Sequence, residues 1–146
     1  MDGKPELASW LRRGAALLVD AAILGLVVAT TLLASGITAD DLRARLESGE
    51  TMFLVAVFLI PEGIYQTAMI GSRSQTLGKI ALGIAVVDAE TRAPIGYPRA
   101  FTRWVSTAAL RALFTLPTIV DHLWPFRDKR NQTLHDKFAR SVVVRV

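Results

Sequence analysis

The sequence contains no cysteine and only two histidines, His122 and His135. The absence of cysteine excludes disulfide bonds, thiolate metal sites and a cysteine nucleophile. Asp121–His122 and His135–Asp136 each place a carboxylate beside an imidazole, but two histidines without a repeated ligand spacing do not predict a zinc site. We therefore expect no metal and no cofactor.

Catalytic patterns are also absent from the sequence. No nucleophile, base and orienting group stand in a recognisable order, and no helical His-Glu zinc pattern occurs. The pair Gly78–Lys79 lacks the spaced glycines of a phosphate-binding loop. We interpret Ser74–Leu82 instead as a short amphipathic helix near the membrane surface, with Lys79 facing lipid headgroups. The protein is not predicted to be an enzyme.

Apolar residues dominate the chain and are separated from its charges. Of the 146 residues, 51% are hydrophobic and 21% are charged, and the mean hydropathy is +0.36. The segments 14–36 and 52–70 carry one charged residue each, Asp20 and Glu62. A hydrocarbon core about 30 Å thick needs roughly 20 apolar residues in a helix. Both segments are predicted to span a membrane, and the first is too long for a cleaved signal peptide.

The distribution of basic residues predicts the orientation of these spans. The chain has 17 Lys and Arg and a net charge of +4. The loop 37–51 carries only Arg43 and Arg45 among four acidic residues, whereas the N-terminal arm, the middle stretch and the tail are basic. Since positive loops stay in the cytoplasm, we expect a multi-pass protein of the inner (plasma) membrane with a cytoplasmic N-terminus. Basic residues that flank spans meet anionic lipids, so the expected partner is the lipid bilayer and not nucleic acid.

A third hydrophobic segment, 104–126, contains Arg111 and Pro117. A full crossing would export the basic tail, so a Pro-broken hairpin or an interfacial helix, opened by Pro98, is favoured and keeps the C-terminus cytoplasmic.

Ile84–Ala89 and Ser141–Val146 are rich in β-branched residues and are predicted to be strands that pair. The expected fold is a single domain, 1–146: an all-α integral membrane protein, a small helical bundle with a minor cytoplasmic β-element.

Asp20 and Glu62 would lie at similar depths in the two spans, roughly 9 Å and 12 Å from the same membrane edge at helical rise. An ionised side chain in the membrane needs a partner, protonation or water. We hypothesise that Asp20, Glu62 and Arg111 form a polar cluster edged by Tyr65 and Gln66. The cluster is either a site for a cation, a proton or a small polar solute, or a structural pairing that holds the helices together.

Three blocks of the sequence resemble the RDD family of small membrane proteins, which is named for one arginine and two aspartates. The first block is Arg12–Asp20, the second runs from Gln75–Lys79 through Val86–Asp88, and the third is Thr133–Asp136 with the closing valines. The resemblance covers almost the whole chain. It implies that Arg12 or Arg13, Asp20 and Asp136 are the signature residues.

The family has no settled activity, and transport of unidentified ligands is the usual suggestion. The leading interpretation is therefore a transport-related component, and the alternative is a non-transporting scaffold or accessory subunit. From the sequence itself, Asp136 is interpreted as a structural carboxylate paired with Lys79 or Arg73. Two or three helices are too few to enclose a solute path, so transport implies a homo-oligomer or other membrane subunits. The small-residue ridge Ala21, Gly25 and Ala29 is expected to pack closely within the chain or between chains.

Overall fold

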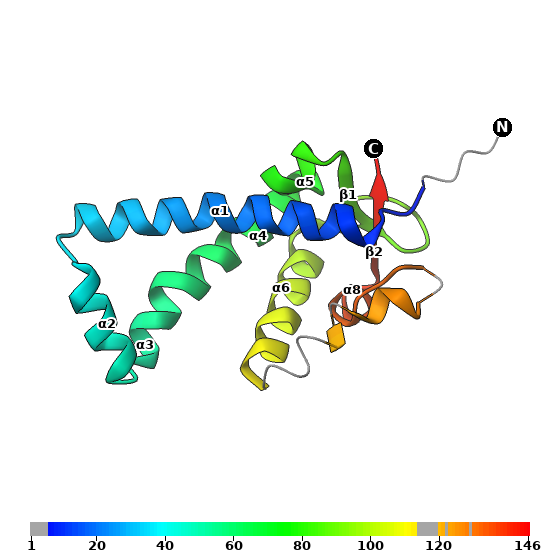
Figure 1. Ribbon diagram of the computed structural model, residues 1–146. Coiled ribbons are helices and arrows are strands. Elements are labelled where there is room, and N and C mark those ends of the chain that lie inside the picture. The colour runs from blue at the N-terminus through cyan, green and yellow to red at the C-terminus, as the bar shows by residue number, and fades with distance from the viewer. Residues whose placement is uncertain (1–5, 114–119, 122, 129) are drawn as a thin grey trace.

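The protein is mostly helical, with one small antiparallel sheet (Figure 1). The computed structural model describes residues 6–113, 120–121, 123–128 and 130–146. The elements are α1 (Trp10–Ala34), α2 (Ala39–Glu47), α3 (Thr51–Leu54), a π-helix (Val55–Leu59), α4 (Ile60–Arg73), α5 (Leu77–Ala81), β1 (Ile84–Asp88), α6 (Gly96–Leu113), a 3-10 helix (Trp124–Phe126), α8 (Leu134–Phe138) and β2 (Ser141–Arg145).

Among the described residues, two helical stretches are long and apolar enough to cross a membrane: Trp10–Ala34 and Thr51–Arg73. The second contains the predicted span 52–70, and the first overlaps the predicted span 14–36 but ends at Ala34. Only 11% and 12% of their most apolar windows are buried within the chain, so their apolar surfaces need lipid or another subunit to cover them. Ser9 caps the start of α1 by accepting a hydrogen bond from the Arg12 amide.

The second stretch changes its helical geometry where proline requires it. Val55–Leu59 forms a π-helical turn directly before Pro61, where the missing amide of proline removes a helical hydrogen bond. The helix continues through Gly71 to Arg73 and ends at Ser74, which adopts a left-handed conformation with φ of 59°. Glycine commonly stops a helix, and the sequence alone predicts an end at Gly71, but the helix passes through it.

Gly71 serves instead as the place where α6 approaches α4 closely. A Cβ atom at Gly71 would lie 2.5 Å from Cδ1 and 2.9 Å from Cα of Tyr97. At Gly63, two residues after Pro61, a Cβ atom would lie 2.6 Å from the Trp104 ring. α6 therefore packs closely against α4 at these two glycines.

The third hydrophobic segment differs in part from the expectation. Its helix begins at Gly96, with Pro98 in the first turn as expected, and α6 extends to Leu113. Arg99, Arg103 and Arg111 all lie on this helix, and it is not one of the two stretches apolar enough to span. Pro117 and His122 lie outside the described residues.

The predicted strands pair, which confirms that part of the fold. β1 and β2 are antiparallel, with Val86 opposite Val143. The N-terminal arm joins the same sheet, because the Ala8 amide donates to the Val143 carbonyl at 2.9 Å and Leu7 forms a bridge with Val144. The arm from residue 6 onward, the middle of the chain and the C-terminal strand therefore meet at one end of α1, with α2 at the other end (Figure 1).

Antiparallel pairing of β1 with β2 constrains the path between them. The chain leaves the sheet at Asp88 and returns to it at Ser141, so the intervening segment begins and ends in the same place. A single crossing of a membrane between these two strands is incompatible with that pairing. The buried cluster around the sheet includes Val86, Ile70 and Ala100, which anchors α4 and α6 to it.

Replacing Gly71 by alanine should destabilise the protein by about 1–3 kcal/mol, because the methyl group would overpack against the Tyr97 backbone and ring. The measurement is the free energy of unfolding in detergent. Gly25→Ala is the matched control, since a Cβ atom there meets nothing within 4 Å and alanine favours the helix. Equal losses in the two variants would contradict the close contact between α4 and α6.

Candidate functional site

Asp20 lies on α1 and is 4% exposed. Its Oδ1 accepts hydrogen bonds from the Tyr65 hydroxyl at 2.7 Å and from the Gly78 amide at 2.8 Å. Its Oδ2 accepts from the Thr76 hydroxyl at 2.5 Å. The carboxylate thus binds the first turn of α5, where backbone amides lack helical partners. A Cβ atom at position 78 would lie 2.1 Å from the Ala16 carbonyl oxygen, so glycine is required for this approach.

Lys79 lies beside this carboxylate without a close ion pair. Its Nζ is 4.0 Å from Asp20 Oδ2 and 3.3 Å from the Thr76 hydroxyl. Burial and then the positive charge of Arg103 lower the pKa of Lys79 to about 8, although Asp20 and Asp136 act in the opposite direction. The sequence had placed this side chain among headgroups, whereas its side chain is 14% exposed.

Glu62 and Arg111 form a separate pair. Arg111 Nη1 donates to both oxygens of Glu62 at 2.8 and 2.9 Å, and Gln66 Nε2 donates to the same carboxylate at 3.1 Å. The predicted cluster is therefore divided in two. Glu62, Arg111 and Gln66 come together as expected, but the partners of Asp20 are Tyr65, Thr76 and Gly78. The hypothesis that Arg111 pairs with Asp20 was wrong, because Arg111 binds Glu62 and the Asp20 carboxylate is occupied by other donors.

Asp136 is fully buried between two arginines. Arg13 Nη1 donates to its Oδ2 at 2.8 Å, and Arg103 Nη1 donates to its Oδ1. Its carboxylate also accepts from the Thr133 amide at 3.1 Å in the capping box that begins α8. Burial opposes ionisation, but the charges of Arg103 and Arg13 outweigh it and hold the pKa of Asp136 well below its ordinary value.

These contacts correct the expected partners of Asp136, which were Lys79 or Arg73. They also distinguish Arg12 from Arg13, the two candidates for the signature arginine. Arg13 contacts Asp136, whereas Arg12 donates to the Leu82 carbonyl at 3.3 Å. Arg103 was not predicted from the sequence. Its position eight residues before Arg111, about two helical turns, became a useful signal only once α6 was known to begin at Gly96.

His135 and Asp121 extend this buried network. His135 Nδ1 lies 2.6 Å from Asp121 Oδ2, and its amide donates to Asp121 Oδ1 at 3.1 Å. His135 Nε2 lies 3.2 Å from Arg103 Nη2. Burial and then the charge of Arg103 lower the pKa of His135, which favours the neutral imidazole. Among the described residues, no group of three His, Cys, Asp or Glu side chains is placed to hold a metal.

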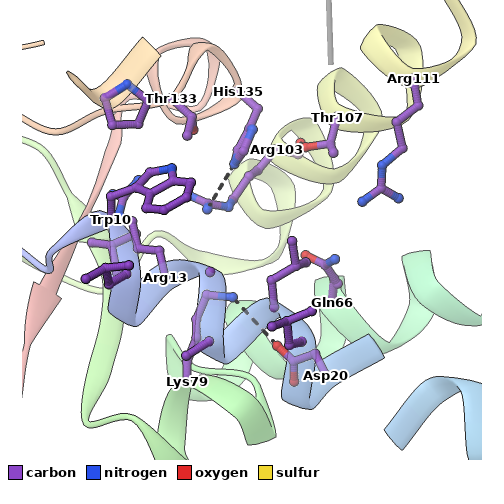
Figure 2. Close-up of a pocket in the computed structure, with 17 residues that line it drawn as sticks. Trp10, Arg13, Asp20, Gln66, Lys79, Arg103, Thr107, Arg111, Thr133 and His135 are labelled. Carbon is purple, nitrogen blue, oxygen red and sulfur yellow. Dashed lines mark hydrogen bonds and ion pairs between the residues drawn. The ribbon is translucent and has the colours of Figure 1, made fainter. Parts of the chain in front are cut away.

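A pocket of about 560 Å³ lies between these networks. It is bounded by the first turns of α1 together with side chains of α4, α5, α6 and the α8 region. Figure 2 shows Arg13, Arg103 and Lys79 reaching toward one part of the pocket, whereas Arg111 lies farther along α6. Asp20 is the carboxylate that lines it, because Asp136 is enclosed behind the arginines.

The small-residue ridge does not pack within the described part of the chain. Ala21, Gly25 and Ala29 are exposed, and a Cβ atom at Gly25 would meet nothing within 4 Å. The expectation of packing within the chain was wrong for this ridge, and packing between chains stays a prediction.

Comparison with known proteins gives one match. The model of the RDD family matches residues 7–140, which include every signature residue named above. No curated protein and no solved structure matches the chain.

Replacing Asp136 by asparagine should cost about 3–5 kcal/mol of stability, because two buried guanidinium groups would lose their counterion. The measurement is the free energy of unfolding in detergent. Glu47→Gln is the control; it removes a carboxylate from a pair with Arg43 in which both side chains are exposed, and it should change stability very little.

The pH dependence offers a second measurement on the same variant. Since the folded-state pKa of Asp136 lies below its ordinary value of 3.8, its stabilisation is complete above that value and is lost as the pH falls below it. The wild type should therefore lose stability in acid more steeply than Asp136→Asn. Parallel acid profiles would show that Asp136 is not ionised between the arginines.

Proposed function

The chain belongs to the RDD family, and we propose that it is a transport-related component that binds a small, negatively charged polar solute in the pocket beside α1. Family membership and the two apolar helices point to a membrane protein. In this proposal the pocket lies near the cytoplasmic surface of the inner membrane, with both termini cytoplasmic, as the distribution of Arg and Lys favours.

The observation that carries the proposal is the surplus of hydrogen-bond donors at the pocket. Arg13 lines it and uses Nη1 to bind Asp136, while its Nε and Nη2 are buried without a partner in the described part of the chain. A buried donor without a partner costs about 1–3 kcal/mol. Lys79 and Arg103 line the same pocket. Oxygen atoms of an anion would satisfy these donors with charge-assisted hydrogen bonds.

A bare cation fits this pocket less well than an anion. The lining carboxylate, Asp20, already accepts hydrogen bonds from three donors, and Glu62 is held by Arg111 and Gln66. Hard cations need several free oxygen ligands. Occupancy by a cation would require these pairs to break, whereas an anion meets groups that are already positive.

The scaffold alternative rests on the same pairs. Asp20, Glu62 and Asp136 each join elements that are distant in the sequence, so every one of them has a structural role without any ligand. In that interpretation the protein is an accessory subunit, and the pocket contains only water. The two functions differ in whether Lys79 binds an added anion. Lys79 makes no ion pair shorter than 4.0 Å.

Transport by this chain would require further subunits, and a homo-oligomer is the simplest arrangement. Two apolar stretches cannot enclose a path across the membrane. The exposed ridge of Ala21, Gly25 and Ala29 offers the small side chains through which membrane helices pack closely. We propose that copies of the first span meet along this ridge.

Sodium phosphate and sodium butyrate should raise the midpoint of thermal unfolding of the detergent-solubilised protein relative to sodium chloride at equal ionic strength. Saturating binding stabilises by about 2.7 kcal/mol at one hundred times Kd. Lys79→Gln should abolish the saturable part of the shift, and Lys137→Gln, whose side chain is 43% exposed and lies outside this pocket, should retain it. A general salt effect would persist in both variants.

Binding should also weaken as the pH rises through about 8, because the Lys79 ammonium then loses its proton. The charged groups that set this pKa are Arg103, Arg13, Asp20 and Asp136. Lys79→Gln should show no such step. Counterflow of the bound anion in proteoliposomes then tests transport: flux that requires Lys79 supports the proposal, whereas absence of Lys79-dependent binding favours the scaffold.

A further inference from the structure

We infer that the occupant of the pocket is an amphiphilic anion, with a carboxylate or phosphate head and an aliphatic tail. The inference rests on the proposed function, since it names the chemical class of the anion. It depends on two features of the lining: one part is cationic, and another part is apolar and comes mostly from α1.

Most of the apolar lining of the pocket comes from one helix. α1 contributes Trp10, Leu11, Leu17 and Leu18 to the lining. Leu11 and Leu18 are separated by seven residues and therefore share a face of the helix, and they are 73% and 72% exposed. Gly14, the smallest lining residue, lies between them, and a Cβ atom there would meet nothing within 4 Å. The result is a hollow bounded by leucine side chains.

The cationic part of the pocket comes from three side chains. Arg13, Lys79 and Arg103 gather beside the Trp10 end of α1 (Figure 2). Arg13 retains two buried donor groups without partners in the described residues, and Lys79 Nζ has Thr76 as its nearest hydrogen-bond partner at 3.3 Å. An anionic head would therefore bind at these three side chains, with its tail along the leucines.

The size of the pocket favours an organic occupant over an inorganic ion. Its volume of about 560 Å³ falls in the range of sites for organic ligands, which combine apolar walls with a few placed polar groups. A phosphate or chloride ion would leave the apolar hollow filled with water. An aliphatic tail would displace that water, and each buried methylene strengthens binding about fourfold.

The position of the hollow on α1 gives the tail a route from lipid. Leu11, Leu17 and Leu18 belong to a stretch apolar enough to span a membrane, and Trp10 is the kind of residue that lies at the membrane interface. A single-chain lipid could enter sideways with its head at the arginines. A water-soluble organic anion with a short apolar group would fit the same chemistry, so the experiment must separate the two sources.

The test is a titration of the full chain in phosphatidylcholine nanodiscs with ethyl, butyl and hexyl phosphate, with empty nanodiscs measuring partitioning. Affinity should rise about fourfold for each added methylene and should fall at least tenfold at every chain length in Lys79→Gln. Gly14→Leu should fill the hollow, so that ethyl phosphate still binds while the gain with chain length disappears. Ala34→Leu is the matched control, because Ala34 lies on the same helix, is exposed and does not line the pocket.

The outcomes separate this inference from the proposed function. Ethyl phosphate that binds through Lys79 with no gain from longer chains would overturn the amphiphilic ligand and leave anion binding intact. A gain that survives in Gly14→Leu would place the tail elsewhere and overturn the inference as well. Absence of any Lys79-dependent binding would overturn the proposed function itself.

A final arm identifies the source of the ligand. Dodecyl phosphate is incorporated into the nanodisc bilayer and competes with soluble hexyl phosphate. Displacement by the bilayer-resident compound supports a single-chain lipid as the occupant. A chain-length gain without such displacement supports a water-soluble amphiphilic anion.

Discussion

The buried carboxylate of Asp136, held between Arg13 and Arg103, is the interaction on which the arrangement of the helices depends. It joins the first turns of α1, the middle of α6 and the start of α8, which are separated by up to 123 positions in the sequence. A buried carboxylate between two guanidinium groups is stable only if all three groups remain in place. Removing the carboxylate or an arginine would leave a buried charge without its counterion. The polar end of the molecule is therefore fixed as one unit, together with the sheet that carries both chain ends.

Asp20 and Asp136 both bind groups at the start of a short helix that is capped by threonine. Thr76 and Thr133 each cap a helix of five residues, and each threonine is followed by leucine. Asp20 binds the amide and hydroxyl groups at the first of these helix starts from outside, whereas Asp136 belongs to the second and closes its capping box. A carboxylate at a helix start satisfies amides that otherwise lack partners. The pocket lies between these two helix starts, so its shape follows from how both are anchored to α1.

Much of the fold could be predicted from the sequence, because its signals are local. The apolar lengths predicted the two candidate spans, and the β-branched runs predicted strands whose pairing is confirmed. The partners of the charges were not predictable in the same way. Arg111 was assigned to the cluster because its charge could compensate Asp20, but charge does not indicate that the Gly78 amide donates to Asp20. Arg103 was missed because its importance depends on the rotation of α6, which is set by contacts at Gly63 and Gly71.

The arginines at this site have a counterion for their charge, but not every one of their N–H donors has a hydrogen-bond partner. A structural role and a ligand-binding role are therefore compatible. A guanidinium group carries five N–H donors, and one carboxylate neighbour cannot occupy them all. Arg103 uses Asp136, Ser141 and His135, whereas Arg13 makes one bond and leaves two buried nitrogen atoms without partners among the described residues. Arginines that hold the helices together therefore still present unused donors to the pocket. A ligand that supplies oxygen atoms could bind there without breaking any ion pair, so the same charges can stabilise the fold and recognise an anion.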